Sequence, residues 1–310
     1  MASDTPSRRS LLIVGGDTDP NITALLSAAD RGGVSYQKLL VGKSSHPSLA
    51  WDIKSGDLLL EGERLQCAAA FVRHDVFTAL EDGQASSQYR AMAWYTAVAG
   101  WLGAHPEVSI FNRRNLNHVT NKPLVLKLAQ DSGLPIPRTL ITNDRQRLAD
   151  FLPEQSGVVK PINGGGYCEP LAEVLEHTAV KYGRAAAPAI VQDRLVPPEI
   201  RIYIIGNRYF AFNMISPELD YRSTQNCRVE PTEVPPDLTD RYGKLLMKLG
   251  LDFAAADFKT CPETGQLLFL EVNTGPMFAG FDRASNGKLC DAMIETLVSG
   301  VKSAARSANE

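Results

Sequence analysis

The first part of the chain is a series of short apolar runs separated by turn residues. Such runs predict buried strands, and longer stretches with mixed apolar faces predict helices. The expected strands are Leu11–Val14, Tyr36–Val41, Ala68–Val72 and Ser109–Asn112, the expected helices are Ile22–Ala29 and Gln88–Leu102, and Leu58–Leu65 should form a hairpin with Glu61-Gly62 at its tip. Strands that alternate with helices indicate a parallel α/β layer. Gly15-Gly16 lacks the rest of a GxGxxG motif, so we interpret this pair as a tight turn.

The next part of the chain combines short elements with a glycine-rich loop. We expect a helix over Pro123–Ser132 that opens at Lys122, a strand over Thr139–Thr142, a helix to about Leu152 capped by Asn143 or Asp144, and a strand over Val158–Lys160. Three glycines follow, Gly164, Gly165 and Gly166. The main-chain amides of such a loop can lie against phosphate, although a flexible hairpin tip has the same composition. Lys160, which lies on the same strand face as Val158, favours a nucleotide-binding loop over a hairpin tip.

The last part of the chain alternates strands with two long helices. The expected elements are a strand over Ala189–Leu195, a hairpin of Glu199–Ile205 and Tyr209–Ile215 around Gly206-Asn207, and helices over Leu238–Leu249 and Leu289–Val301. Pro197 and Pro198 cannot continue a strand ladder, so we expect them to connect two layers. Arg201 lies among apolar strand residues. A buried arginine requires an anionic partner, so this position predicts a contact with phosphate or carboxylate.

Two carboxylates occupy a second expected hairpin, formed by Phe253–Phe258 and Leu267–Val272. Asp257 and Glu271 can therefore sit on neighbouring strands, with Asn273 on the same face as Glu271. Carboxylate and amide oxygens suit Mg²⁺ bridged to nucleotide phosphates. A strand pair that ends in solvated acids is the alternative interpretation, and the three oxygen-bearing residues together favour the metal.

Composition narrows the class of protein. The chain has 310 residues, 44% hydrophobic and 22% charged, which suggests two or three packed subdomains of an ordinary globular protein. The net charge of −3 indicates no nucleic-acid-binding surface, and no apolar run approaches the roughly 20 residues that cross a bilayer. The five cysteines are scattered without a CxxC pair. This pattern predicts reduced thiols in a cytoplasmic protein, without zinc or disulfides.

Taken in order, these motifs resemble those of an ATP-grasp ligase over roughly residues 110 to 285. The run consists of an Asn-Lys helix that ends in Gly-Leu-Pro-Ile-Pro-Arg-Thr, then Val-Val-Lys-Pro with a Gly loop, Val-Gln-Asp, Glu-Ile-Arg, Ala-Asp-Phe and Leu-Glu-Val-Asn-Thr-Gly-Pro. Within that superfamily the chain is most similar to the RimK-type and graspetide (microviridin-type) peptide ligases. The run Thr139–Asp144 and the Arg73-His74 pair are similar to the latter group. The implied fold is α/β (α+β), an ATP-grasp fold preceded by a Rossmann-like pre-ATP-grasp domain, with boundaries at 1–115, 116–190 and 191–310.

The resemblance implies a role for each matching residue. Lys122 and Lys160 would contact ATP phosphates, and Gly164, Gly165 and Gly166 would close over them. The adenine pocket would be lined by Gln192, Asp193, which is glutamate in many relatives, and Leu195. The transferred phosphoryl group would be stabilised by Lys160, Arg201 and Arg222. Two Mg²⁺ ions, for which Mn²⁺ can substitute, would be held by Asp257, Glu271 and Asn273.

The activity implied by the resemblance is ADP-forming carboxylate–amine or carboxylate–alcohol ligation. A carboxylate would attack the γ-phosphorus of ATP, and an amine, hydroxyl or thiol would then displace phosphate from the acyl phosphate. A peptide or amino acid is the expected substrate, without nucleic-acid or membrane partners, and the relatives suggest a homodimer. Arg73, His74, Arg113 and Arg114 are candidates for binding an acidic substrate, and the last two fit a solvated linker equally well. The alternatives are a kinase acting on a small hydroxyl acceptor and a non-catalytic nucleotide sensor, while a Rossmann oxidoreductase lacks its fingerprint.

Overall fold

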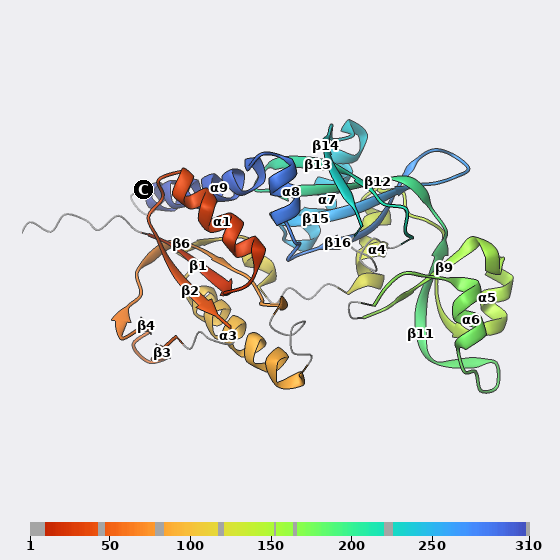
Figure 1. Cartoon of the computed structure of the whole chain (residues 1–310), viewed down its shortest axis with the longest axis horizontal. Helices are drawn as coiled ribbons and strands as arrows, with labels where there is room; N and C mark the ends of the chain where they lie inside the picture. The colour runs from red at the N-terminus through yellow and green to blue at the C-terminus, as the bar shows by residue number, and fades with distance from the viewer. Residues whose placement is uncertain are drawn as a thin grey trace, which may run out of the picture.

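Three sheets form the framework of the protein. The computed structural model describes residues 10–42, 47–77, 84–116, 121–151, 153–163, 166–219 and 226–307. We call the three main sheets, by their order along the chain, the first, the middle and the C-terminal sheet. In space the C-terminal sheet lies between the other two (Figure 1). Among the described residues, no helix combines the length and the apolar character that a membrane crossing requires.

The first sheet is parallel and buried on both faces. Its strand order is β2 (Tyr36–Val41), β1 (Ser10–Gly16), β6 (Cys67–Val72) and β7 (Ser109–Ile110). Leu11 and Ile13 of β1 pack with α1 (Pro20–Arg31) and α9 (Lys288–Ser307), whereas Leu12 and Val14 pack with α3 (Ala85–Ala104). Helices on both faces explain why these strands are continuous apolar runs, as the parallel-layer prediction requires.

We call the first sheet, together with the helices that cover it, the first lobe. A small antiparallel sheet extends this lobe. It consists of β3 (Leu49–Trp51), β4 (Leu58–Leu60) and β5 (Glu63–Arg64). Glu61 and Gly62 form the tip between β4 and β5, and both have positive φ angles, of 52° and 81°. The predicted hairpin is therefore confirmed, with glycine at a position that needs left-handed backbone.

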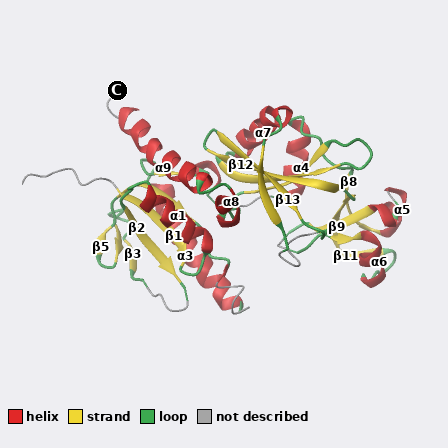
Figure 2. Cartoon of the chain, turned by 45° about the horizontal axis from the view of Figure 1, so that its top comes forward, coloured by secondary structure: helices red, strands yellow, loops and turns green. Residues whose placement is uncertain are grey.

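The middle sheet is antiparallel and carries two short helices. Its strand order is β10 (Glu169–Pro170), β9 (Gly157–Pro161), β11 (Arg184–Asp193) and β8 (Thr139–Asp144). Helices α5 (Arg145–Phe151) and α6 (Leu171–His177) cover one face, where Leu148, Leu171 and Val191 form a small core (Figure 2). The Asp144 carboxylate accepts hydrogen bonds from the main-chain N–H groups of Gln146 and Arg147 at 2.9 and 3.2 Å. Asp144 is thus the residue that caps α5.

The C-terminal sheet is antiparallel and separates two cores. Its strand order is β14 (Arg228–Thr232), β13 (Arg208–Ile215), β12 (Val196–Ile205), β15 (Phe253–Thr260) and β16 (Leu267–Asn273). Ile200, Ile202 and Ile204 of β12 face α4 (Lys122–Asp131) and α7 (Pro236–Leu249). Tyr203 and Ile205 face the opposite way, into a core shared with α8 (Ala279–Ala284), α9 and the first sheet. This shared core joins the first lobe to the C-terminal sheet.

The structure differs from the predicted elements at the two prolines. Pro197 and Pro198 lie within β12 rather than between layers, and the ladder to β15 shifts register between Val196 and Glu199. A bulge leaves the prolines outside the regular hydrogen-bond pattern, which removes the conflict with their missing N–H groups.

The predicted domain boundaries can be compared with the packing. The boundary at residue 190 falls inside β11, and α9 packs against α1 and β6 of the first lobe although it ends the chain. Helix α4, just after the boundary at residue 115, packs against β16 and α7 of the C-terminal sheet. The three-part division stays a prediction.

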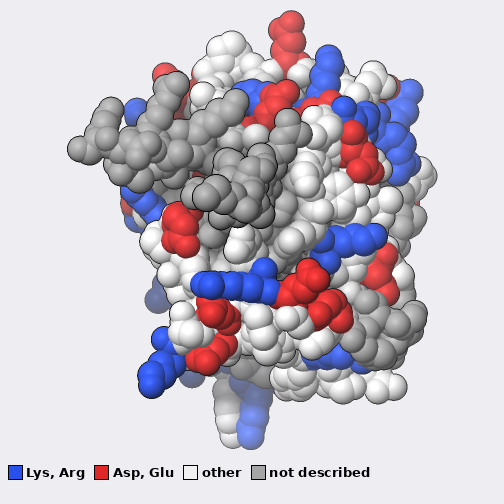
Figure 3. All heavy atoms as spheres, turned by 90° about the vertical axis from the view of Figure 1, so that its left-hand side faces the viewer, with Lys and Arg blue, Asp and Glu red and all other residues white. Residues whose placement is uncertain are grey.

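Charges on the exposed end of the first lobe are mixed. Basic and acidic side chains lie among each other on this face, with uncharged surface between them (Figure 3). This agrees with the small net charge of the chain, −3.

Candidate active site

A cleft lies where α4, the middle sheet and the edge strand β16 meet. Five of its lining residues are polar: Lys122, Lys160, Gln192, Glu271 and Asn273. Its apolar lining consists of Val125, Leu126, Ile190, Leu270 and Val272. The cleft therefore collects side chains from segments that are far apart in sequence, and all five of the polar ones were predicted site residues.

The fold explains how these polar side chains meet. Lys122 is the first residue of α4, directly after the N-cap Asn121. Lys160 on β9 pairs with Ile190 on β11, and Gln192 is two residues further along β11. Residues two apart share a strand face, so β9 and β11 present Lys160, Ile190 and Gln192 to one side. Lys122 from α4 and Lys160 from β9 both line the cleft, and their positive charges suit phosphate.

Gln192 carries an acceptor that no described residue uses. Its side chain is 1% exposed, and its Nε2 donates to the Thr139 hydroxyl at 3.0 Å. Its Oε1 is buried without a hydrogen-bond partner among the residues that the structure describes. A buried carbonyl oxygen left unpaired costs about 1–3 kcal/mol. A ligand with an N–H donor, such as an amino-purine, fits this position.

The two predicted metal-binding carboxylates are direct neighbours. Asp257 on β15 and Glu271 on β16 are paired in the antiparallel ladder, next to a register shift between Asp257 and Phe258. The Asp257 carboxylate is 7% exposed and accepts from Arg201 Nε at 2.6 Å and Nη2 at 2.8 Å. Arg201 is thus held by a carboxylate, one of the two anions predicted for it.

The donor set of this pair fits a magnesium ion. Each oxygen of Asp257 uses one lone pair on Arg201 and keeps another, and Glu271 supplies a second carboxylate beside it. Among the described residues, no group of three or more histidine, cysteine, aspartate or glutamate side chains could hold a metal. Magnesium is commonly bound by one or two carboxylates together with substrate phosphates and water, so the pair is sufficient.

A second charged pair lies beside the first and was not predicted. Glu199 and Lys259 are partners in the same ladder, two residues from Arg201 and Asp257, and their side chains meet at 3.0 Å. Burial raises the pKa of Glu199 above its ordinary value, and the charge of Lys259 opposes this shift. The Glu199-x-Arg201 spacing on one strand was the available signal, because it places both charges on one face.

The remaining predicted site residues that the structure describes are not among those lining the cleft. The Asp193 carboxylate is bound by Arg138, with the closest contact at 2.8 Å to Nη2. Leu195 is 6% exposed, and a side chain at Gly166 would meet Pro161 at 3.0 Å. Gly164, Gly165 and Arg222 lie outside the described residues.

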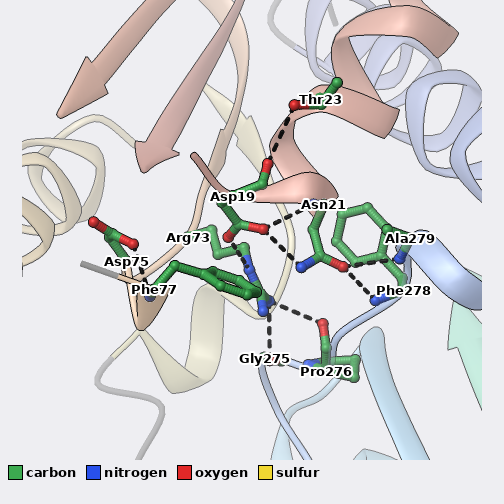
Figure 4. A network of polar contacts seen from close by, with 10 residues as sticks. All are labelled: Asp19, Asn21, Thr23, Arg73, Asp75, Phe77, Gly275, Pro276, Phe278 and Ala279. Atoms are coloured by element: carbon green, nitrogen blue, oxygen red, sulfur yellow. Dashed lines mark hydrogen bonds and ion pairs between the residues drawn. The ribbon is translucent and has the colours of Figure 1, made fainter. Parts of the chain in front are cut away.

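The arginines considered for substrate binding are engaged within the protein. Arg113 donates to the main-chain carbonyls of Leu102, His105 and Val108, at the end of α3. Arg73 donates to Asp19 and to two carbonyls after β16 (Figure 4).

Their two sequence neighbours differ in exposure, since Arg114 is exposed and His74 is half-buried. Arg114 packs against Gly250, and a Cβ atom added to Gly250 would lie 2.7 Å from the Cβ atom of Arg114. Burial lowers the pKa of His74, whose Nε2 finds no partner among the described residues.

Comparison with known proteins was made at the level of sequence and of structure. No protein-family model and no curated protein sequence matches the chain. The ATP-grasp ligase PsnB, complexed with a minimal precursor, Mg and ADP, is 22% identical with a TM-score of 0.72, over 94% of this chain and 98% of PsnB. The macrocyclase MdnC from Microcystis aeruginosa MRC, bound with the precursor peptide MdnA, is 20% identical with a TM-score of 0.70, over 94% and 99%. D-cycloserine synthetase DcsG is 14% identical with a TM-score of 0.60, over 94% and 100%. The chain therefore has the ATP-grasp fold.

Proposed function

We propose that the protein is an ATP-dependent ligase that activates a carboxylate as an acyl phosphate and joins it to an amine or hydroxyl, releasing ADP and phosphate. The observation that carries this proposal is the cleft itself. One cleft combines two lysines, a buried amide oxygen without a partner and a glutamate beside the Arg201-bound Asp257. The lysines suit a triphosphate, the amide oxygen suits a purine and the carboxylates suit Mg²⁺.

Each residue has a distinct task in this mechanism. Lys122 and Lys160 bind the phosphates and offset their charge, so that an anionic carboxylate can approach the γ-phosphorus. Gln192 orients the base by accepting from its amino group. Asp257, Glu271 and Asn273 would hold Mg²⁺, which supplies further charge neutralisation at the phosphates when bound. Arg201 would stabilise the transferred phosphoryl group, and two hydrogen bonds from its guanidinium to Asp257 fix its orientation.

Several parts of the proposal rest on the resemblance. Gly164, Gly165 and Gly166 would close over the phosphates and keep water from the acyl phosphate. Asp193 and Leu195 would contribute main-chain contacts to the adenine, and Arg222 would assist Arg201. The homodimer stays a prediction. A cytoplasmic location is proposed because all five cysteines are thiols rather than disulfides.

We propose a peptide as the substrate, rather than a free amino acid. Support comes from two of the structural neighbours, since PsnB is complexed with the precursor peptide PsnA2 and MdnC is bound with the precursor peptide MdnA. D-cycloserine synthetase has a lower TM-score, 0.60 against 0.70 or more. These likenesses favour a ligase that modifies peptides in specialised biosynthesis.

The proposed function predicts which products form from ATP. The purified protein, incubated with Mg·ATP and either a peptide fraction or a small-metabolite fraction of host extract, should release ADP and free phosphate with the peptide fraction only. Chromatography of the nucleotides together with a phosphate assay measures this. AMP with pyrophosphate would exclude the acyl-phosphate mechanism, whereas ADP without free phosphate would identify a kinase. Turnover with small metabolites alone would keep the ligase and reject the peptide.

The orphaned oxygen of Gln192 leads to a second prediction. Gln192→Met should raise the KM for ATP about tenfold while changing kcat much less, because a hydrogen bond to a buried acceptor contributes about 1–3 kcal/mol. It should also reduce the preference for ATP over ITP. In the wild type, Gln192 Oε1 would repel the carbonyl oxygen at C6 of hypoxanthine, and methionine removes this repulsion. Steady-state kinetics with both nucleotides tests this expectation.

Thr139→Val is the matched control for this variant. It removes the partner of Gln192 Nε2 and leaves the Oε1 acceptor in place. Its preference for ATP should stay close to that of the wild type. An unchanged preference in Gln192→Met would show that this side chain does not contact the base.

A further inference from the structure

The loop that follows β16 is held in an unusual way. We call Thr274–Ala279 the exit segment; it starts directly after Asn273, which lines the cleft. Each of its six residues has one main-chain polar group that is bonded to a side chain from elsewhere in the chain. Asn112 donates to Thr274 O, Arg73 to Gly275 O and Pro276 O, and Tyr203 to Met277 O, while Asn21 accepts from Phe278 N and Ala279 N.

Three of these four side chains belong to the first lobe. Asn21 lies in α1, Arg73 directly follows β6 and Asn112 follows β7. The carboxylate of Asp19 joins two of them, since it accepts from Arg73 Nε at 2.8 Å and from Asn21 Nδ2 at 2.7 Å (Figure 4). Asp19, Asn21, Arg73 and Asn112 are all at most 7% exposed. A buried polar network of the first lobe therefore sets the path of the exit segment.

Stability alone does not account for this network. An ion pair as buried as Arg73–Asp19, with side chains 6% and 0% exposed, contributes little net stability, because desolvation offsets the attraction. Joining the lobe to the C-terminal sheet is already achieved by apolar contacts, such as those of Phe278 with Phe71 and Phe253. Packing does not confine Gly275, since a Cβ added there would meet nothing within 4 Å. Hydrogen bonds, with their directional geometry, fix this stretch instead.

We propose that Arg73 is a positioning residue of the active site, acting through the exit segment on Asn273 and Glu271. This inference rests on the proposed function, because it assumes that these residues bind Mg²⁺ with the nucleotide. Partners that orient metal ligands typically change metal affinity about 10- to 100-fold when they are lost. The first lobe would thus contribute to metal binding without contacting the metal.

The test compares Arg73→Lys with Arg113→Lys. Lysine keeps the charge of Arg73 but lacks the planar fork with which Arg73 bonds Asp19 through Nε and the two carbonyls through Nη1. Arg113 also donates to main-chain carbonyls within the first lobe, but to none in the exit segment. We expect Arg73→Lys to weaken the binding of Mg·ADP about tenfold. Its affinity for ADP without metal and its thermal midpoint should match those of Arg113→Lys, as measured by titration calorimetry and thermal unfolding.

The outcomes separate the inference from the proposed function. Wild-type protein that binds no Mg·ADP would reject the proposed function itself. Wild-type binding together with equal Mg·ADP affinities in the two variants would overturn only the role of Arg73. If Arg73→Lys fails to fold, Asn21→Ser, which removes the acceptor for Phe278 and Ala279, should show the same loss of metal-dependent affinity. Failure of both variants to fold would assign the network to stability and overturn the proposal.

Discussion

Glu271→Gln should lower ADP formation about a thousandfold and leave the fold intact. A bound metal ion contributes several kcal/mol of charge stabilisation, and about 1.4 kcal/mol corresponds to a tenfold change in rate. Glutamine has the shape of glutamate but is a poorer ligand for a hard cation. Position 271 is half-buried on an edge strand, where an isosteric change disturbs little packing. The rate of ADP release at saturating Mg²⁺ measures the effect.

Glu230→Gln is the matched control on the opposite edge of the same sheet. Glu230 is half-buried on β14 and pairs with Arg228. It lies outside the cleft, so this variant should keep wild-type activity. A Glu271→Gln protein with more than about a tenth of wild-type activity would remove Glu271 from the metal site, because the several kcal/mol expected of a metal ligand would then be missing.

Arg201→Met should have the largest effect on stability. It leaves the Asp257 carboxylate buried without its counter-charge, and breaking a buried pair in this way costs about 3–5 kcal/mol. Urea unfolding measures the loss. Arg208→Met is the control, because Arg208 and Glu295 form a pair with side chains 40% and 69% exposed, and such surface pairs contribute about 1 kcal/mol or less.

A double variant separates stability from catalysis at this position. Arg201→Met with Asp257→Leu removes both charges, and apolar replacement of a buried pair is often neutral or stabilising. The double variant should regain most of the lost unfolding free energy and stay inactive. Recovery of ADP formation in the double variant would show that neither residue has the catalytic role proposed here.

Local signals explain the parts of the site that were predicted from sequence. The alternation of β15 and β16 and the turn between them fix which side chains share a face, so Asp257, Glu271 and Asn273 could be grouped before the fold was known. Lys160 followed from its strand and the glycine loop after it, whereas Gln192 was assigned from the resemblance to ATP-grasp ligases. In each case a short stretch of chain contains the required information.

Contacts between distant segments explain what the sequence did not reveal. The Glu199–Lys259 pair depends on β12 lying beside β15, and neither strand specifies its neighbour. The same holds for Arg73, whose carbonyl partners are 202 and 203 residues away. Pairings at such separations are chosen by tertiary packing, so an isolated arginine was equally consistent with a substrate contact.

The place of α9 has a consequence for how the chain folds during synthesis. Leu289, Met293 and Leu297 of this last helix complete the core that α1 and the first sheet begin. Until the ribosome has made α9, the part of this face that α1 does not cover stays exposed. The strands of the first lobe are therefore translated early, but their core is completed last. This reverses the usual N-terminal-first order of domain folding. Ribosome-bound chains that stop before Lys288 should expose this face to chaperones.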